Sequence, residues 1–303
     1  MFFVKWFLIP WLIFIIIVGV YLIYYKNEKY ELKPFVDLSS VDIKELLIMD
    51  KKRAISEGVN IEENMPKFYK GNNNIGVLLI HGFTASPYEM SFLANYLNSK
   101  GYTVYNARVA GHGSRPENLN LLTYEDWYES LKYSYYVLKN SCDKIVVVGQ
   151  SMGGLLAYVV ATFNDVDKVV MLVPGLGIKS FKFKLVPILK NFIDFVKKEN
   201  FSDDLKEYYY NVRPIKALFQ LKLLIEYTWS ILNKRQFPVY IIYSEYDDVI
   251  DNKKIVNFYN KLDSSKKKID LIKQKDIKHV LTLNSNPIVN NIFGQIEEWI
   301  REE

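Results

Sequence analysis

The sequence of 303 residues holds only one cysteine and three histidines. The single cysteine, Cys142, excludes an internal disulfide, and neither residue type recurs at the spacing of zinc ligands, so the sequence indicates no metal and no other cofactor. Basic and acidic residues nearly balance at 39 and 34 and are spread along the chain. A nucleic-acid-binding protein carries a more concentrated basic stripe. Small molecules and membranes remain as the expected partners.

Charge is also missing from the N-terminal stretch of residues 6–25. A helix of about twenty apolar residues can span a bilayer, and Lys5 and Lys26 bracket the stretch, with aromatic residues toward its ends as in membrane helices. A cleaved signal peptide is the alternative, but bulky residues continue where a small-residue cleavage site would stand. We therefore expect a single-pass anchor over residues 1–29. The lysines on its two sides slightly favour a cytoplasmic location for the rest of the chain.

A serine between two glycines is the most informative motif of the chain. Residues 144–149 predict a strand and residues 152–163 predict a helix, and the turn between them has the sequence Gly-Gln-Ser-Met-Gly. Ser151 at such a sharp turn occupies strained backbone, and only Gly149 and Gly153 leave room for it. The free N–H groups of the following helix would stabilise an anion beside the serine. The pattern is typical of a nucleophilic serine.

A serine hydroxyl needs a base to become a nucleophile, and that base is usually a histidine. His81 and His112 each follow a strand pattern and precede the serine, whereas His279 lies far downstream, shortly before a terminal amphipathic helix. We assign His279 as the general base and expect His112 to be a structural residue.

The histidine needs a carboxylate partner at the end of a strand between serine and histidine. Residues 239–244 predict that strand, and Glu245, Asp247 and Asp248 follow it. Any of the three acids could reach a histidine from the next loop. We choose Asp247, with Asp248 in reserve, to accept the Nδ1 proton of the base and stabilise its charged form.

Ester cleavage also needs two N–H donors directed at the developing oxyanion. They normally come from the residue after the nucleophile and from the loop after an earlier strand. These positions correspond to the backbone amides of Met152 and Phe83, where Gly82 allows the chain to turn. Each such donor typically lowers the barrier by about 3 kcal/mol.

With these residues in place, the chain resembles the α/β-hydrolase fold and, within it, bacterial monoacylglycerol lipases and small carboxylesterases. The matching motifs stand in the family's order and are Leu79-Ile80-His81-Gly82-Phe83-Thr84, Ala110-Gly111-His112-Gly113, Gly149-Gln150-Ser151-Met152-Gly153-Gly154, Tyr246-Asp247-Asp248-Val249-Ile250 and His279-Val280-Leu281-Thr282-Leu283. The resemblance implies the same triad of Ser151, Asp247 and His279, with the amides of Phe83 and Met152 as oxyanion donors.

Alternating strand and helix patterns predict a mostly parallel sheet with helices on both faces. The expected strands are residues 75–80, 102–107, 144–149, 168–173, 239–244 and 267–273. The expected helices are residues 87–100, 124–140, 152–163, 253–262 and 287–302. We divide the chain into the anchor at 1–29, a stalk with short helices at 30–70, and a hydrolase domain at 71–303 with a helical cap inserted at about 176–236.

The cap insertion is rich in apolar and basic residues. Its apolar side chains recur at mostly helical spacing, and they are Phe181, Leu185, Ile188, Leu189, Phe192, Ile193 and Phe195. We expect most of them to pack the cap onto the body and a minority to contact lipid, because a basic amphipathic surface suits an anionic bilayer.

The sequence therefore predicts a membrane-anchored serine hydrolase that cleaves monoacylglycerols or related lipid esters through an acyl-enzyme on Ser151. Thioesterases, C–C bond hydrolases and proline-type aminopeptidases of the same fold use the same triad and stay as alternatives. A membrane-tethered binding protein without catalysis is the alternative from another class. Convergence of Ser151, Asp247 and His279 in the folded chain would distinguish an enzyme from it.

Overall fold

The computed structural model describes residues 9–12, 15–16, 30–199 and 202–302. The chain forms two compact units, Met1–Lys33 and Pro34–Glu303. In the first unit, residues 9–12 and 15–16 are helical. None of the helices in the described ranges combines the length and the apolar character that a membrane span requires. The predicted membrane helix at residues 6–25 lies largely outside the described residues, so the anchor stays a prediction.

The second unit is built on a seven-stranded sheet with the order β1-β3-β2-β4-β5-β8-β9. Its strands are β1 (Lys67–Tyr69), β2 (Ile75–Ile80), β3 (Thr103–Ala107), β4 (Lys144–Gln150), β5 (Lys168–Leu172), β8 (Val239–Ser244) and β9 (Lys267–Ile272). Only β1 runs antiparallel to its neighbour, and all other pairs are parallel. The central strands are mainly apolar and are buried except for Ile75 and Lys144 at their first positions, as strands covered on both faces should be.

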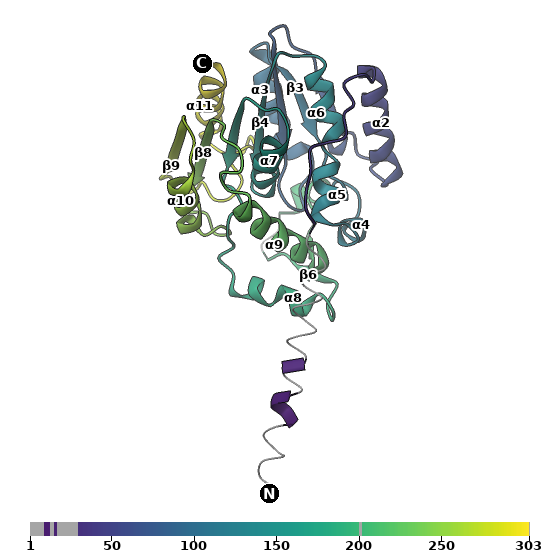
Figure 1. Cartoon of the computed structure of the whole chain (residues 1–303), viewed down its shortest axis with the longest axis vertical. Helices are drawn as coiled ribbons and strands as arrows, with labels where there is room; N and C mark the ends of the chain where they lie inside the picture. Colours follow the sequence, from purple (N-terminus) through teal and green to yellow (C-terminus); the bar gives the residue numbers. More distant parts are fainter. Residues whose placement is uncertain (1–8, 13–14, 17–29, 200–201, 303) are drawn as a thin grey trace, which may run out of the picture. The chain divides into compact units, whose positions relative to one another are not determined.

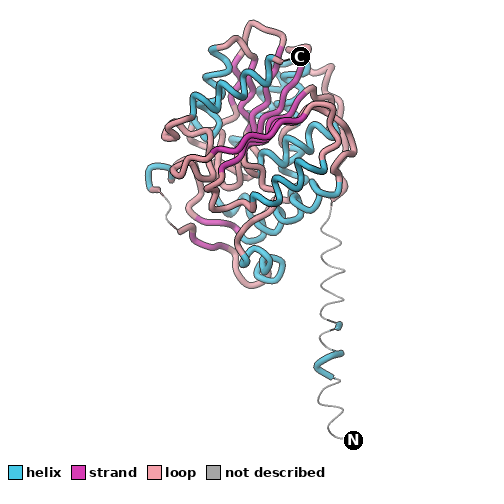
Figure 2. Tube along the Cα trace, turned by 90° about the vertical axis from the view of Figure 1, so that its left-hand side faces the viewer, coloured by secondary structure: helices cyan, strands magenta, loops and turns pink. Residues whose placement is uncertain are grey.

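Helices lie on both sides of this sheet (Figure 2). They include α3 (Tyr88–Ser99), α4 (Pro116–Asn120), α5 (Tyr124–Glu129), α6 (Lys132–Lys139), α7 (Met152–Phe163), α10 (Asn252–Lys261) and α11 (Val289–Arg301). The single helix expected at residues 124–140 is split into α5 and α6, because the Ser130 hydroxyl donates to the carbonyl of Trp127 and accepts the amide of Ala110. The layers and the strand order are those of the α/β-hydrolase fold that the sequence predicted.

Residues 34–70 differ from the expected stalk, because they belong to the same compact unit as the sheet. Helix α2 (Ile43–Ser56) packs beside α6 (Figure 1) and buries Leu46 and Ala54. Its Asp50 accepts a hydrogen bond of 2.7 Å from the hydroxyl of Tyr105 on β3. After a short 3-10 turn, η1 (Glu62–Asn64), strand β1 extends the sheet. The boundary expected at residue 70 therefore does not separate two bodies.

The cap insertion follows β5 and returns to the sheet at β8. It consists of η2 (Phe181–Leu185), α8 (Val186–Leu189), β6 (Phe195–Lys197), η3 (Asp203–Leu205), β7 (Val212–Pro214) and α9 (Ile215–Ser230). The first part is not the continuous amphipathic helix that the spacing suggested, since a 3-10 turn, a single α-turn and a short antiparallel ribbon replace it.

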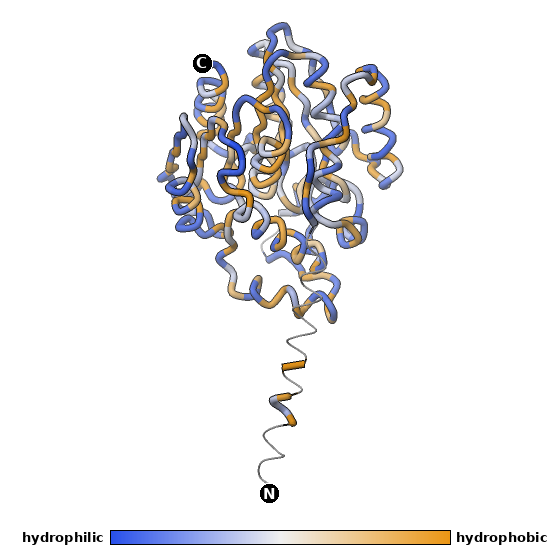
Figure 3. The backbone as a smooth tube through the Cα atoms, in the orientation of Figure 1, coloured by the Kyte–Doolittle hydropathy of each residue, from blue (hydrophilic) through white to orange (hydrophobic). Residues whose placement is uncertain are grey.

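The apolar side chains of this first part are largely exposed, which corrects the expectation that most of them pack the cap onto the body. Five of the seven are exposed, and they are Phe181, Leu185, Ile188, Phe192 and Ile193. Hydrophobic positions accordingly alternate with hydrophilic ones along this outer loop in Figure 3. The cap instead packs through α9, which contacts α7 and buries Phe219 and Leu224 among other side chains.

Candidate active site

Ser151 occupies a strained turn between β4 and α7. Its φ of +56° lies in the left-handed region that disfavours a side chain. The two flanking glycines permit this turn, because a Cβ atom on Gly149 would lie 2.0 Å from the carbonyl oxygen of Gly153, and one on Gly153 would lie 2.1 Å from that of Ile80. The backbone of Gly153 packs directly against Gly149 and Ile80, and the serine between the two glycines lies at the carboxyl ends of the parallel strands.

His279 contacts both Ser151 and Asp247. The Nε2 atom of His279 lies 2.9 Å from Ser151 Oγ, and its Nδ1 atom lies 2.7 Å from Asp247 Oδ2. A carboxylate accepts only, so Nδ1 carries the proton in this arrangement and the bare Nε2 accepts the serine hydroxyl. The structure thus brings together the three side chains that the sequence singled out, although His279 lies 128 residues from Ser151 and 32 residues from Asp247 along the chain.

Asp247 is held as an anion by the turn that follows β8. Its Oδ1 atom accepts the backbone amides of Val249 at 2.6 Å and Ile250 at 2.7 Å, which leaves Oδ2 for the histidine. Burial acts to raise the pKa of Asp247, but the hydrogen bond and charge of His279, together with the two amides, hold this pKa below its usual value. The carboxylate is therefore charged and fixed in direction at neutral pH.

The other two acids of this loop are not placed to act on the histidine. Asp248 is exposed and lies 3.8 Å from the ammonium group of Lys278, and Glu245 is exposed at the start of the loop. Asp247 alone of the three contacts His279, as we chose from the sequence.

His81 and His112 are buried structural residues. The Nε2 atom of His81 accepts the amide of Val109 at 3.1 Å, and its Nδ1 atom lies 2.9 Å from the carbonyl oxygen of Gly82. Burial lowers the pKa of His81 to about 4. Burial and the neighbouring His81 ring also hold the pKa of His112 well below its ordinary value. Both rings are neutral at physiological pH and stabilise the loops after β2 and β3.

The expected oxyanion donors belong to the two segments that meet at the serine. Met152 is the first residue of α7, and Phe83 follows Gly82 in the loop after β2. A Cβ atom on Gly82 would lie 3.4 Å from Ser151 Cβ, so this loop runs directly beside the nucleophile. Thr84 has a φ of +62°, an unusual conformation for a β-branched residue that indicates a constrained loop. The roles of the Phe83 and Met152 amides stay predictions.

Two residues that the sequence analysis did not single out hold the histidine loop. The Gln150 side chain donates to the carbonyl oxygen of His279 at 2.8 Å and accepts the amide of Leu281 at 3.3 Å. The Ser244 hydroxyl donates to the carbonyl oxygen of Ile277. Gln150 stands inside the serine motif, so its position was visible, but its contact with a loop 129 residues away was not.

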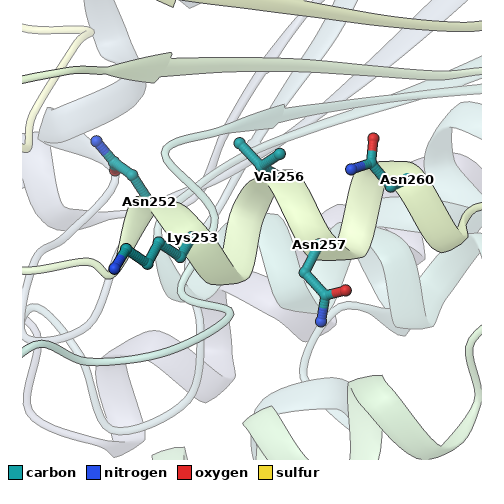
Figure 4. A pocket seen from close by; sticks show the side chains of 5 residues that line it. All are labelled: Asn252, Lys253, Val256, Asn257 and Asn260. Atoms are coloured by element: carbon teal, nitrogen blue, oxygen red, sulfur yellow. The ribbon is translucent and has the colours of Figure 1, made fainter.

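A surface pocket lies along α10. It is lined by Asn252, Lys253, Val256, Asn257 and Asn260 (Figure 4). All five come from one helix and none of them touches Ser151 or His279 through a hydrogen bond that we observe, so the pocket is an open helix face. Within the described part of the chain, we find no cluster of three His, Cys, Asp or Glu side chains that could bind a metal ion.

Comparisons with known proteins agree with this geometry. Residues 77–262 match the model of the alpha/beta hydrolase family. The chain is 30% identical over 233 residues to a thermostable monoacylglycerol lipase of Bacillus sp. strain H-257, covering 76% of this chain and 92% of the relative. It is 27% identical over 225 residues to a carboxylesterase of Bacillus subtilis strain 168, covering 72% and 89%.

A solved structure from a study of two metagenome-derived lipolytic enzymes is also similar. It superposes with a TM-score of 0.73 at 26% identity and covers 80% of this chain and 99% of that one.

Proposed function

Because this chain belongs to the alpha/beta hydrolase family and is a serine ester hydrolase, we propose that it cleaves monoacylglycerols or related lipid esters through an acyl-enzyme on Ser151. The observation that carries this proposal is the continuous hydrogen-bonded series from Asp247 through His279 to Ser151 Oγ, with contacts of 2.7 and 2.9 Å. A non-catalytic protein would have no need to keep these three groups aligned beside a strained serine.

In the first half of the reaction, His279 Nε2 takes the proton of Ser151 as Oγ attacks the carbonyl carbon of the ester. The negative charge that forms on the carbonyl oxygen is stabilised by the amides of Phe83 and Met152. Asp247 stabilises the imidazolium and keeps its Nε2 directed at the reacting atoms. The imidazolium then protonates the leaving alcohol, and the acyl group stays on Ser151.

In the second half, a water molecule replaces the alcohol. His279 accepts a proton from the water as its oxygen attacks the acyl carbonyl carbon, and the same two amides stabilise the second oxyanion. Collapse of this intermediate breaks the bond to Ser151 Oγ, which recovers its proton from His279. The products are a carboxylic acid and the free enzyme.

The lipid part of the proposal rests on the cap and on the relatives. Phe181 and Phe192 are 69% and 80% exposed, and the neighbouring Lys182, Lys184 and Lys197 are also exposed. Apolar and basic side chains on one exposed loop suit an anionic lipid surface. A monoacylglycerol lipase and a carboxylesterase are among the relatives. The cap loop is therefore the surface through which we expect the enzyme to contact a bilayer that holds its substrate.

We further propose that residues 6–25 form a single membrane anchor and that the hydrolase domain lies on the cytoplasmic side. This part is supported by the absence of charge over about twenty residues and by the flanking lysines. Protease accessibility in sealed vesicles tests it, since a cytoplasmic hydrolase is protected in right-side-out vesicles and digested in inverted ones.

A panel of esters tests the substrate assignment. The full chain in nanodiscs would be assayed on monoacylglycerols of graded chain length and on short water-soluble esters, with Ser151→Ala as the background control. We expect kcat/KM to increase with acyl length. Cleavage of the short esters with no action on monoacylglycerols would remove the lipid assignment, and faster cleavage of matched thioesters would redirect it to a thioesterase.

The cap has its own matched control. We expect Phe192→Ser to lower activity on monoacylglycerol in vesicles and to leave activity on a soluble short ester unchanged. Leu121→Ser is the control, because Leu121 is 79% exposed at the end of α4, outside the cap. Equal effects of the two substitutions would speak against lipid contact through the cap.

A further inference from the structure

A buried carboxylate that the triad does not use lies behind the loop of residues 82–84, which we call the oxyanion loop. It belongs to Glu89 in the first turn of α3, and its side chain is 2% exposed. We propose that Glu89 is a positioning residue that fixes the oxyanion loop and couples its geometry to the cap through Tyr209. This inference rests on the proposed function and concerns the same site.

Glu89 contacts three separate parts of the site. Its Oε2 atom accepts the backbone amide of Gly82 at 2.6 Å, and its Oε1 atom accepts the hydroxyl of Tyr209 at 2.9 Å. Its backbone carbonyl oxygen accepts the hydroxyl of Thr282 at 2.7 Å, three residues beyond His279. One residue therefore connects the oxyanion loop, the cap and the histidine loop.

The contact with Gly82 is close to the reacting atoms. A Cβ atom on Gly82 would lie 3.2 Å from Glu89 Oε2 on one side and 3.4 Å from Ser151 Cβ on the other. The next residue, Phe83, carries one of the two amides expected to bind the oxyanion. Fixing the Gly82 amide from behind therefore limits how far the Phe83 amide can move relative to the serine.

The cap holds the other end of the same loop. The backbone amide of Tyr210 donates to the carbonyl oxygen of Thr84 at 2.9 Å, and the Tyr210 hydroxyl donates to the carbonyl oxygen of Gly111 at 2.7 Å. The ring of Tyr208 stacks on Tyr88 at 3.7 Å. A strained residue such as Thr84 keeps its conformation only when its surroundings enforce it, and the hydrogen bond from the Tyr210 amide to its carbonyl oxygen supplies that constraint.

Each carboxyl oxygen of Glu89 accepts one hydrogen bond, and burial and nearby charges act on the pKa of the group. Burial raises the pKa of Glu89, while the Gly82 amide, the Tyr209 hydroxyl and the nearby charges of His279 and Lys198 act in the opposite direction. Burial also lowers the pKa of Lys198 to about 7. The net effect raises the pKa of Glu89, and each of its two oxygens keeps acceptor capacity in either protonation state, one for the Gly82 amide and one for the Tyr209 hydroxyl.

Positioning of this kind acts on the transition state, because the oxyanion exists only there and in the tetrahedral intermediates. Replacing Glu89 should therefore lower kcat and leave KM nearly unchanged. We expect about a 10-fold fall in kcat for Glu89→Gln, which keeps one acceptor oxygen, and about 100-fold for Glu89→Ala. Tyr209→Phe keeps the Gly82 bond and should lower kcat by roughly 3- to 5-fold.

The experiment is carried out on the full chain with a short ester as substrate and Tyr208→Phe as the control, since Tyr208 contributes its ring to Tyr88. Inhibition by an alkyl trifluoromethyl ketone, which forms an oxyanion on the serine, is measured in parallel. The inhibition constant of each variant should increase by the same factor as kcat/KM falls. Tyr208→Phe should change neither.

Three results would overturn the proposal: unchanged kcat in Glu89→Gln and Tyr209→Phe, an effect on KM alone, or an inhibition constant that does not follow kcat/KM. Urea unfolding identifies variants that fail to fold, and if Glu89→Ala is one of them the other two variants decide. Ser151→Ala separates this proposal from the proposed function. If Ser151→Ala stays active the proposed function itself fails, whereas an inactive Ser151→Ala with fully active Glu89 variants removes only the positioning role.

Discussion

The side-chain amide of Gln150 bonds to the backbone at His279 and again two residues later, at Leu281. It donates to the carbonyl oxygen of His279 at 2.8 Å and accepts from the amide of Leu281 at 3.3 Å, and it is completely buried. The residue that precedes the nucleophile therefore sets the position of the base. These two hydrogen bonds therefore help to set the distance between Ser151 and His279.

Removing the link should reduce both stability and rate. We expect Gln150→Ala to lower the free energy of unfolding by about 2 kcal/mol, because two buried backbone groups lose their partner, and to lower kcat by about 10- to 100-fold as the base moves. Urea unfolding and ester kinetics measure the two effects. Gln236→Ala is the control, since the Gln236 amide contacts only the exposed Asp263. Equal behaviour of both variants would contradict the role of Gln150.

The acid of the triad can be tested against its neighbour in the chain. Asp247→Asn keeps the shape of the side chain but no longer fixes the Nδ1 proton of His279, so we expect kcat to fall about 10³- to 10⁴-fold. Asp248→Asn should stay within about 2-fold, because the exposed Asp248 contacts only Lys278 in a weak surface pair. A large effect of Asp248→Asn with an active Asp247→Asn would reverse the assignment.

We expect alanine to change stability in opposite directions at two glycines, Gly153 in the serine turn and Gly294 in α11. A methyl group on Gly153 would meet backbone atoms at 2.1 and 2.7 Å, which cannot move without breaking the turn, so Gly153→Ala should lower the free energy of unfolding by about 3 kcal/mol or more. Gly294 lies inside α11, where an added methyl group would come no closer than 4.0 Å to Tyr96. Gly294→Ala should raise stability by about 0.5 to 1 kcal/mol. Thermal unfolding measures both, and a stable Gly153→Ala would refute the tight turn.

The buried histidines predict a loss of stability in acid. Burial lowers the pKa of His81 to about 4 from 6.5, so between these values the unfolded chain binds the extra proton and the folded chain does not. The free energy of unfolding therefore falls as pH drops from about 6.5 to about 4, by on the order of 3 kcal/mol for a shift of this size.

The variant His81→Asn isolates this effect, because its amide does not titrate and can keep the hydrogen bond that Nδ1 makes to the carbonyl oxygen of Gly82. We expect its unfolding free energy to depend less on pH in the same window. The comparison also cancels the contribution of Glu89, whose raised pKa acts in the opposite direction and stabilises the fold as pH falls. An identical pH dependence in the two proteins would contradict a neutral, buried His81.

The sheet and the helices that flank the serine could be predicted because each is a strong local pattern. Strands β2 and β8 and helix α7 have the expected boundaries, since buried parallel strands are uninterrupted apolar runs and the serine turn fixes both of its flanks. The triad followed from motif order, and the structure brings its members into contact.

The N-terminal part of the second unit could not be predicted in the same way. Helix α2 buries Leu46 and Ala54, but it also exposes Ile48, Met49 and Ile55 and buries Asp50. Its apolar residues therefore surround the helix and give no clear periodicity. Strand β1 has only three residues and depends on β3 for its existence.

The sequence predicted a cap insertion, but the packing of the cap and the residues behind the triad were missed because they depend on tertiary contacts. Phe181 and Phe192 have suitable spacing for a buried face, yet the chain between them is broken into short turns that leave both exposed. Glu89, Gln150 and Tyr209 are polar residues whose partners lie more than a hundred residues away or in another loop. A single sequence contains no local signal for such pairs.

The central claim is that Ser151 is an activated nucleophile, and labelling by a fluorophosphonate probe tests it most directly. The full chain should become labelled on Ser151, the label should disappear in Ser151→Ala, and Asp247→Asn should react at least about 100-fold more slowly. A well-folded protein that takes up no label, or a Ser151→Ala variant that is labelled like the unaltered chain, would contradict the claim.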